Sequence, residues 1–262
     1  MIQPRIYLVT ACWNAARTLP ETLRALEDQE SGWSHHFVID GVSTDGTLEI
    51  AHAFRERHLR KVTVISEPDT GIYNAMNKGV GLALEQAHDD DLIAIINADD
   101  YYLPGALDLM RDNAAKYPEI DVFYGDCEIM DEEGIPAGKT RPSSQSLPIR
   151  PNCFLMPLEH PTMFVRAKVY RDLGLYDESY RIAADYEFVL RLIDARISAR
   201  HVGASITYFR EGGISTTAIE ESFKEAIRAR VDHGSNPLLE WTRYRKQKLN
   251  EFIYGRYRRM RT

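Results

Sequence analysis

Two adjacent carboxylates stand directly after an apolar run near the middle of the chain. The run 92–96 is followed by Asn97, Ala98, Asp99 and Asp100. Neighbouring carboxylates repel each other and lose solvation beside apolar side chains, which costs free energy unless an opposite charge is close. We therefore expect a positively charged partner beside this turn.

Further aspartates stand at the ends of two other predicted strands. Asp40 ends the segment "HHFVID", and Asp69 follows the segment "KVTVIS". If the strands are parallel, these residues and Asp99 and Asp100 lie at one edge of the sheet. Such an edge suits a hard divalent cation, Mg²⁺ or Mn²⁺, with Asp99 and Asp100 as candidate ligands. The alternative is that Asp99 caps the helix that begins near Pro104 and Asp100 is a solvated turn residue.

Strand and helix patterns alternate through the first half of the chain. The segments typical of strands are 5–12, 35–40, 61–66, 91–97 and 120–126, and helical patterns occupy 18–28, 45–58, 71–87 and 104–117. This alternation predicts right-handed crossovers and an α/β fold with a mainly parallel sheet flanked by helices. Ligands bind such sheets at the carboxyl ends of the strands.

The alternation stops after Gly125. The segments expected beyond it are a hairpin at 127–139 turning at Glu133-Gly134, a Pro- and Ser-rich loop at 140–152, an amphipathic helix at 183–195, a short strand near 206–209 and a helix at about 218–233. These patterns predict a second half that is less regular than the first, ending in a helical extension.

Composition limits the class of protein. Apolar residues make up 44% of the 262 residues and charged residues 27%, which is ordinary for a globular protein. Neither a signal peptide nor a transmembrane run is expected. Cys12, Cys127 and Cys153 are far apart and odd in number. They favour neither a zinc site nor a disulfide framework and fit the reducing cytoplasm.

The charge is distributed unevenly. Residues 241–262 contain eight Lys or Arg and one Glu, whereas the remainder contains 24 basic and 38 acidic residues. The acidic body disfavours nucleic acid as a partner. In the basic tail, one helical face would hold Leu249, Phe252, Ile253, Tyr257 and Met260. This pattern leaves two alternatives, a helix packed on the acidic body or a peripheral contact with anionic lipid at the inner face of the membrane.

Four motifs in fixed order carry a family resemblance. They are "VIDGVSTDGT", "SEPDTGIYNAMNKGV", "IINADD" and "AADYEFVLRL". Over roughly residues 5–210 the chain resembles the inverting family 2 glycosyltransferases of GT-A fold, especially bacterial enzymes that build surface polysaccharides and glycolipids. The resemblance implies a catalytic domain at 1–215, a C-terminal helical tail at 216–262, and transfer of a sugar from a nucleotide-diphosphate donor, typically a UDP-sugar.

The resemblance also implies roles for individual residues. Thr10 resembles a nucleoside contact, and Asp40 resembles the aspartate that hydrogen-bonds the base. Asp69 and Lys78 lie where the family surrounds the nucleoside and diphosphate; for Lys78 the alternative is a solvated helix residue. Trp13 and Asn14 are candidates to line the nucleoside pocket, and Trp13 could instead pack against the body.

The motif at 97–99 resembles the DXD motif, with Asp99 at the metal-binding position. Asn97 departs from the pattern, because many members have Asp there. The change removes one charge and leaves a ribose or water contact to an amide.

Glycosyl transfer explains the remaining candidates. A cation neutralises the leaving diphosphate, and a carboxylate takes the proton of the attacking acceptor hydroxyl, which belongs to a saccharide or a lipid-linked acceptor. The resemblance places Asp185 as this base, and the first turn of a helix favours its ionised form. A plain N-cap is the alternative for Asp185. His160 is a candidate contact to the acceptor or diphosphate, or else a packed or surface histidine.

Other classes of protein fit the sequence less well. A Rossmann dehydrogenase would have GxGxxG where this chain has "TACWNAA", and the Gly41–Gly46 spacing lacks the lysine of a P-loop. Two alternatives remain, a nucleotidyltransferase that makes a nucleotide sugar and an inactive sugar-nucleotide-binding domain.

Overall fold

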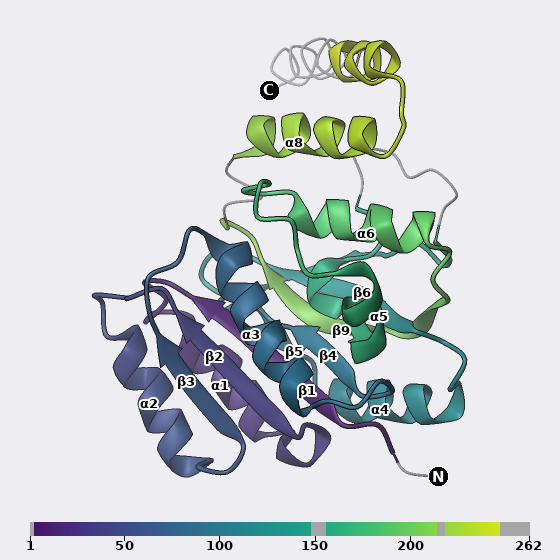
Figure 1. Ribbon diagram of the computed structural model, residues 1–262. Helices are drawn as coiled ribbons and strands as arrows, with labels where there is room; N and C mark the ends of the chain where they lie inside the picture. Colours follow the sequence, from purple (N-terminus) through teal and green to yellow (C-terminus); the bar gives the residue numbers. More distant parts are fainter. Residues whose placement is uncertain (1–2, 148–155, 214–217, 247–262) are drawn as a thin grey trace.

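The protein is an α/β molecule built on one mixed sheet. The computed structural model describes residues 3–147, 156–213 and 218–246 (Figure 1). The strands are β1 (Ile6–Cys12), β2 (His35–Asp40), β3 (Val62–Ser66), β4 (Leu92–Ile95), β5 (Tyr101–Tyr102), β6 (Val122–Met130), β7 (Pro136–Arg141), β8 (Phe164–Arg166) and β9 (Ala199–Arg210). Their order in the sheet is β3-β2-β1-β4-β8-β6-β9-β5, and β7 pairs with β6.

Helices cover both faces of this sheet. They are α1 (Leu19–Glu27), α2 (Thr47–Arg57), α3 (Ile72–Gln86), α4 (Ala106–Lys116), α5 (Ala167–Leu173), α6 (Ala184–Asp194) and α8 (Ile219–Asp232), with short 3₁₀ turns η1 (Glu30–Gly32) and η2 (His160–Thr162). In the ranges that the structure describes, no helix is long and apolar enough to cross a bilayer.

The first half forms as the hydrophobic pattern predicts. Strands β3, β2, β1 and β4 are parallel neighbours, in register from Tyr7 opposite His35 to Cys12 opposite Asp40 between β1 and β2. Because both faces of β1 are covered, its side chains alternate between two cores. Ile6 and Leu8 pack on the side of α1, α2 and α4, whereas Tyr7 and Val9 pack on the side of α3, α5 and α6.

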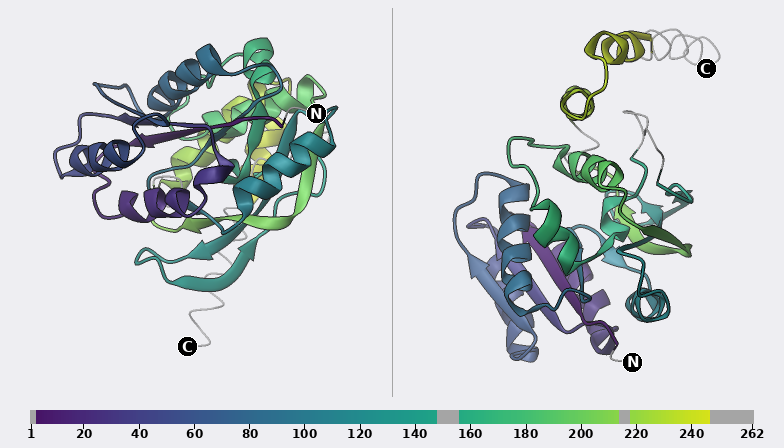
Figure 2. Two further views of the ribbon diagram at one scale, coloured as in Figure 1. Left: turned by 90° about the horizontal axis from the view of Figure 1, so that it is seen from below. Right: turned by 45° about the vertical axis from the view of Figure 1, so that its right-hand side comes forward.

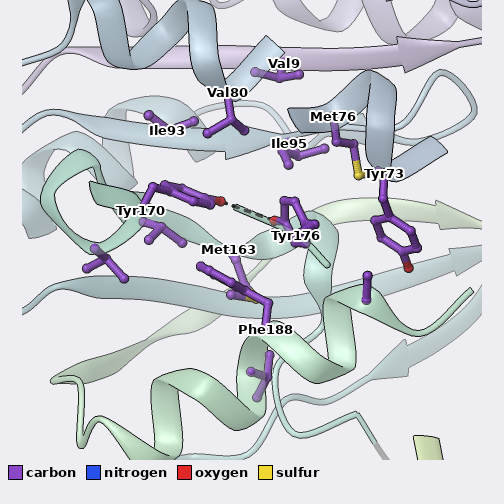
Figure 3. Close-up of a cluster of buried hydrophobic side chains, with 14 of the residues drawn as sticks. Val9, Tyr73, Met76, Val80, Ile93, Ile95, Met163, Tyr170, Tyr176 and Phe188 are labelled. Atoms are coloured by element: carbon purple, nitrogen blue, oxygen red, sulfur yellow. Dashed lines mark hydrogen bonds between the residues drawn. The ribbon is translucent and has the colours of Figure 1, made fainter. Parts of the chain in front are cut away.

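The core beneath α3 is rich in aromatic residues (Figure 3). Val80 of α3, Ile95 of β4 and Phe188 of α6 meet there. The hydroxyls of Tyr170 and Tyr176 satisfy each other at 3.2 Å, so two polar atoms are accommodated inside this cluster.

A glycine allows α3 to lie close on the sheet. A Cβ at Gly79 would stand 2.3 Å from Cγ1 of Val9 and 3.2 Å from Cγ1 of Ile39. Only the absence of a side chain lets the helix approach β1 and β2 at this distance. The approach fixes the N-terminal turn of α3, which reaches the carboxyl edge of the sheet.

The second half departs from the predicted pattern in detail. The hairpin of β6 and β7 is confirmed, with Gly134 at φ +86° in its turn. Strand β6 runs parallel to β4 but is separated from it by β8, which is antiparallel to both. Strand β9 has 12 residues where a short strand was expected. Sequence patterning missed β5, β8 and α5, because elements of two to seven residues carry too few side chains to show a period.

The C-terminal helix α8 is bonded to the body rather than separate from it. It lies along α6 (Figure 1; Figure 2, right). Asp232 accepts a hydrogen bond from the Tyr180 hydroxyl at 2.6 Å, and His233 lies 2.6 Å from Asp194. A domain boundary near residue 215 stays a prediction, and these bonds make α8 part of the packed structure.

A further helical stretch, residues 237–246, follows α8. Glu240 forms a buried pair with Arg230 at 2.8 Å, and the Tyr244 ring packs edge-on against Phe223. The first residues of the basic tail therefore pack on α8. The predicted face formed by Leu249, Phe252, Ile253, Tyr257 and Met260 lies outside the described residues.

We expect Gly79→Ala to destabilise the protein and Gly81→Ala not to. The added methyl at residue 79 meets Val9, and overpacking of this kind costs roughly 1–3 kcal/mol. Gly81 lies in the same helix with nothing within 4 Å of an added Cβ, so alanine there should raise stability by up to about 1 kcal/mol. Urea unfolding of the two variants measures the difference. Equal stabilities would show that α3 does not need this close approach.

Candidate active site

A cavity of about 880 Å³ opens at the carboxyl ends of the parallel strands. Its walls come from the segments after β1, before α3, after β4 and at the end of β9, together with residues 178–182 and α8. The lining residues used below are Trp13, Asn14, Asp69, Asn97, Asp99, Asp100, Glu132, Glu178, Arg210 and Glu225. This is the position at which open α/β sheets bind ligands.

The cavity wall is strongly acidic. The lining carboxylates belong to Asp69, Asp99, Asp100, Glu132, Glu178, Glu211, Glu221 and Glu225, against the guanidinium groups of Arg17, Arg181 and Arg210. An excess of negative charge repels a phosphate-bearing ligand unless cations accompany it. The cavity therefore favours either a cationic ligand or an anion bound together with a metal ion.

Arg210 is the positive partner of the Asp99-Asp100 turn. It ends β9, and its backbone N–H donates to Oδ1 of Asp100 at 2.9 Å while its Nε donates to the carbonyl of Asp99 at 3.1 Å. The guanidinium also reaches the carbonyl of Glu132 at 3.1 Å and the carboxylate of Glu21 at 2.5 Å. One arginine thus joins the turn, the β6–β7 hairpin and α1.

The two aspartates of the turn have different surroundings. Asp100 is 1% exposed and accepts from the N–H of Arg210 and from Nδ2 of Asn97 at 3.2 Å, while also belonging to the cavity lining, and its role as a metal ligand stays a prediction. Burial, reinforced by the charge of Asp99, raises the pKa of Asp100 well above its usual value. Burial also raises the pKa of Asp99. Within the described ranges no other residue donates a hydrogen bond to the Asp99 carboxylate, which therefore remains available to the cavity.

The residues of this turn fit a cation that is shared with a ligand. Among the described residues, no group of three or more His, Cys, Asp or Glu side chains could hold a metal ion by itself. Mg²⁺ and Mn²⁺ are commonly held by one or two carboxylates and completed by substrate phosphates and water. Asp99 supplies such a carboxylate. Oδ1 of Asn97 is buried with no hydrogen-bond partner in the described structure, as expected of a group that a ligand satisfies.

The segment after β1 lines the cavity, but Thr10 does not. Thr10 is fully buried and its hydroxyl lies 2.9 Å from Nε2 of His36, so the expected nucleoside contact is corrected in favour of the residues that follow it. Asn14 has φ +50° and its Oδ1 accepts from the N–H of Thr44 at 2.9 Å. Trp13 is 68% exposed on the cavity wall and therefore does not pack against the body.

Asp40 and Asp69 lie on opposite sides of Gly41. Asp40 is fully buried, and its carboxylate accepts from the hydroxyls of Ser43 and Ser66 at 2.5 and 2.6 Å, so it does not face the cavity as expected. Asp69 does line the cavity. Its Oδ2 stands 2.5 Å from where a Cβ on Gly41 would be, so glycine makes room for this carboxylate.

Lys78 supports the site from outside. Its ammonium donates to the carbonyl of Pro68 at 2.8 Å and pairs with Glu67 at 2.8 Å. It is absent from the cavity wall, so the expected phosphate contact is replaced by a structural one. Through these bonds Lys78 holds the segment that presents Asp69.

Asp185 stands in the first turn of α6, as expected. It does not itself line the cavity, and the Tyr73 hydroxyl joins it to the lining residue Ile182. Its Oδ1 accepts from the hydroxyl of Tyr73 at 3.1 Å and from the N–H of Tyr186 at 2.7 Å. Burial raises the pKa of Tyr73 well above its usual value, so this hydroxyl stays protonated. Glu187, the next carboxylate along the helix, pairs instead with Arg191 at 2.9 Å and His233 at 3.2 Å and is not a substitute base.

His160 is a packed histidine. It is 7% exposed, and Nε2 lies 2.9 Å from the hydroxyl of Tyr176. Burial lowers its pKa, an effect opposed by Asp185. His160 does not line the cavity, so in this position its side chain contacts Tyr176 and does not reach an acceptor or diphosphate bound there. Its neighbour Glu159 is buried near Arg141, and burial raises the pKa of Glu159 to about 7.

Sequence reasoning missed three residues that organise the site, namely Arg210, Glu178 and Glu225. Glu178 accepts from the side-chain amides of Asn74 and Asn77, each at 2.9 Å. No local pattern marks such residues, because each acts on a segment far away in the sequence.

The fold and the cavity define a sugar-transferring enzyme of GT-A fold. The chain belongs to glycosyl transferase family 2, whose model matches residues 7–174. It is therefore a glycosyltransferase, and the position of Asp99 at the end of β4 agrees with the resemblance that the motifs carry.

Named relatives are glycosyltransferases too. The chain is 27% identical over 230 residues to the PGL/p-HBAD biosynthesis glycosyltransferase of Mycobacterium bovis, covering 87% of this chain and 85% of that one. It is 24% identical over 258 residues to the putative glycosyltransferase EpsE of Bacillus subtilis, covering 96% and 86% of the two chains. Both relatives are named as glycosyltransferases, and the mycobacterial one is named for PGL/p-HBAD biosynthesis.

Solved structures share the fold. The S. aureus TarS 1–349 structure in complex with UDP-GlcNAc matches with a TM-score of 0.64 at 19% identity, covering 90% of this chain and 69% of that one. The chain spans 41% of the longer TarS structure. A mannosyltransferase from Pyrobaculum calidifontis, in complex with GDP-Man and Mn²⁺, matches with a TM-score of 0.58 at 14% identity, covering 99% and 84% of the two chains.

Proposed function

We propose that the protein is an inverting glycosyltransferase that moves a sugar from a nucleotide-diphosphate donor, a UDP-sugar, to a hydroxyl of a saccharide or lipid-linked acceptor. The observation that carries this proposal is the Asp99 carboxylate, which lines an acidic cavity at the carboxyl edge of the sheet close to the unpartnered Oδ1 of Asn97. The UDP-GlcNAc complex of TarS, which shares the fold, supports a UDP-sugar as the donor.

The donor is held between the β1 segment and the Asp99 turn. The exposed ring of Trp13 offers a face on which the nucleobase stacks, beside Asp69. The diphosphate lies toward Asp99 and Asn97, which would hold Mg²⁺ or Mn²⁺. A bound cation neutralises the charge that develops on the leaving diphosphate. Arg210 contributes by keeping the turn in place.

Asp185 is the general base in this proposal. As the acceptor oxygen forms its bond to the anomeric carbon, the bond from that carbon to the diphosphate oxygen breaks, and the acceptor proton passes to the Asp185 carboxylate. Attack opposite the leaving group inverts the anomeric centre. The Tyr73 hydroxyl and the N–H of Tyr186 donate to this carboxylate and orient it.

The family disfavours the two other readings of the sequence. A nucleotidyltransferase would release pyrophosphate, whereas family 2 enzymes transfer a glycosyl group. An inactive binding domain would have no use for Asp185 in addition to Asp99. Release of UDP from the donor distinguishes turnover from mere binding.

We further propose a peripheral membrane contact through residues 237–246. Leu238, Leu239 and Trp241 are 78%, 48% and 43% exposed, and Arg245 and Lys246 are exposed on the same helical stretch. An exposed apolar face with basic residues beside it suits the surface of an anionic bilayer. Because α8 lines the cavity and precedes this stretch, the contact would bring the cavity near a lipid-linked acceptor.

Replacing Asp99 with Asn should remove metal-dependent donor binding and leave the fold intact. Asparagine keeps the size of the side chain and removes a largely buried charge beside Asp100, so the substitution costs little stability, whereas loss of a charged ligand weakens binding by about tenfold or more. Calorimetry of UDP binding with and without Mn²⁺ measures the effect, with Asp112→Asn on the exposed face of α4 as the control. Unchanged Mn²⁺-dependent affinity in Asp99→Asn would contradict the assignment.

Replacing Asp185 with Asn should abolish turnover while donor binding survives. Asparagine keeps the shape and caps a helix almost as well as aspartate, but it cannot accept the proton. The rate should fall by roughly 10²–10⁴-fold. UDP-GlcNAc, UDP-glucose and UDP-galactose are screened for UDP release with Mn²⁺, and the variant is then assayed on the active donor, with UDP affinity and melting temperature measured alongside. A near-normal rate would make Asp185 a helix cap only.

The double variant Leu238→Ser/Trp241→Ser should lose binding to anionic vesicles. Full-length protein is floated with phosphatidylcholine vesicles that contain or lack phosphatidylglycerol, and we expect flotation only with the anionic lipid. Leu59→Ser, at a 73% exposed leucine after α2, is the control and should float as the parent does. Absence of flotation in the parent protein would rule out the contact.

A further inference from the structure

The short segment before α6 depends on a side chain of α8. The backbone N–H groups of Arg181, Ile182 and Ala183 all donate to the carboxylate of Glu225, at 3.0, 2.8 and 3.0 Å. On the other side, the carbonyl of Ile182 accepts from the Tyr73 hydroxyl of α3 at 2.6 Å. Two helices far apart in sequence thus hold the three residues that lead into the turn of Asp185.

Glu225 takes the place of a helix cap. The first N–H groups of a helix have no partner within the helix and are usually satisfied by the side chain of the N-cap residue. The N-cap of α6 is Ala183, which has no polar side chain. The Glu225 carboxylate from α8 accepts instead from the N–H of this N-cap residue and of the two residues before it, and a negative charge is favoured at a helix N-terminus.

The position of Glu225 is itself fixed by other bonds along α8. Arg228 donates to the carbonyl and hydroxyl of Ser179 at 3.0 and 2.8 Å, and Asp232 accepts from Tyr180 at 2.6 Å. Because α8 is also held by these contacts to Ser179 and Tyr180, before the segment, and by His233 to Asp194, beyond it, loss of the Glu225 carboxylate alone would free the segment without detaching the helix.

We propose that Glu225 is a positioning residue for Asp185, and that α8 belongs to the catalytic unit although it lies beyond the residues that the family model matches. This inference rests on the proposed role of Asp185 as the base. Held by Glu225 from one side and Tyr73 from the other, the segment presents the Asp185 carboxylate to the acceptor hydroxyl in one orientation.

Glu225→Gln is the direct test, in the full-length protein with the active UDP-sugar and Mn²⁺. The amide retains one acceptor oxygen for three donors, so the segment should shift, and a displacement of the base by about 1 Å can cost on the order of 10²-fold in rate. We expect kcat to fall by about 10- to 100-fold while the affinity for UDP with Mn²⁺ changes less than about twofold. Glu220→Gln, which removes a surface partner of Lys224 on the same helix, should match the parent enzyme.

A double-mutant cycle separates positioning from general destabilisation. If Glu225 acts through Asp185, the double variant Asp185→Asn/Glu225→Gln should be no slower than Asp185→Asn alone. Arg5→Met removes the ion pair with Asp91 at the amino ends of β1 and β4, away from the cavity, so it should lower the melting temperature and leave kcat unchanged.

The outcomes distinguish this inference from the function on which it rests. A normal kcat in Glu225→Gln, multiplicative losses in the double variant, or a kcat loss in Arg5→Met equal to that in Glu225→Gln would each overturn the role of Glu225. A normal rate in Asp185→Asn would overturn the proposed base, whatever Glu225→Gln does.

Discussion

Burial of two neighbouring carboxylates is the constraint around which this structure is organised. Asp99 and Asp100 stand at the edge of the sheet with little access to water, and Arg210 compensates for their charge from the last strand. For this arginine to reach the turn, β9 must run along the full edge of β6 and pair with the short β5 that follows the aspartates. The same side chain reaches Glu132 and Glu21. The mixed part of the sheet, formed by β8, β6, β9 and β5, is therefore the scaffold that brings the Arg210 guanidinium to the acidic turn.

Local patterns predicted the part of the fold that local physics determines. The four strand–helix units of the first half appear where apolar periodicity placed them, because each unit buries side chains of neighbouring sequence. The antiparallel β8 between β4 and β6 was not predicted, since a strand of three residues has no readable period and is selected by the gap that it fills. Arg210 and Glu225 were missed for a related reason, because their partners lie 110 and about 42–44 residues away.

The sequence indicated at which edge of the sheet the candidate residues lie, but not in which direction each of their side chains points. Polar residues at strand ends correctly indicated the edge that holds the cavity, and Asp69, Asn97 and Asp99 line it. Thr10 shares the alternation of Ile6 and Leu8, so its side chain points to the buried side of α1 and α2. Asp40 meets serine hydroxyls, and a sequence shows neither which face a residue occupies nor which neighbour reaches it first.

Helix α3 contacts two groups of residues at the cavity, Asp69 on one side and Glu178 and Asp185 on the other. Its N-cap is Gly71, whose N–H donates to Asp69 of the cavity wall at 2.9 Å. Tyr73 of the first turn meets Asp185, and Asn74 and Asn77 meet Glu178. Because the helix packs directly on β1 at Gly79, its N-terminal turn cannot shift without moving the helix as a whole. A movement of α3 that widens the cavity beside Asp69 therefore also displaces the contacts of the helix with Asp185 and Glu178.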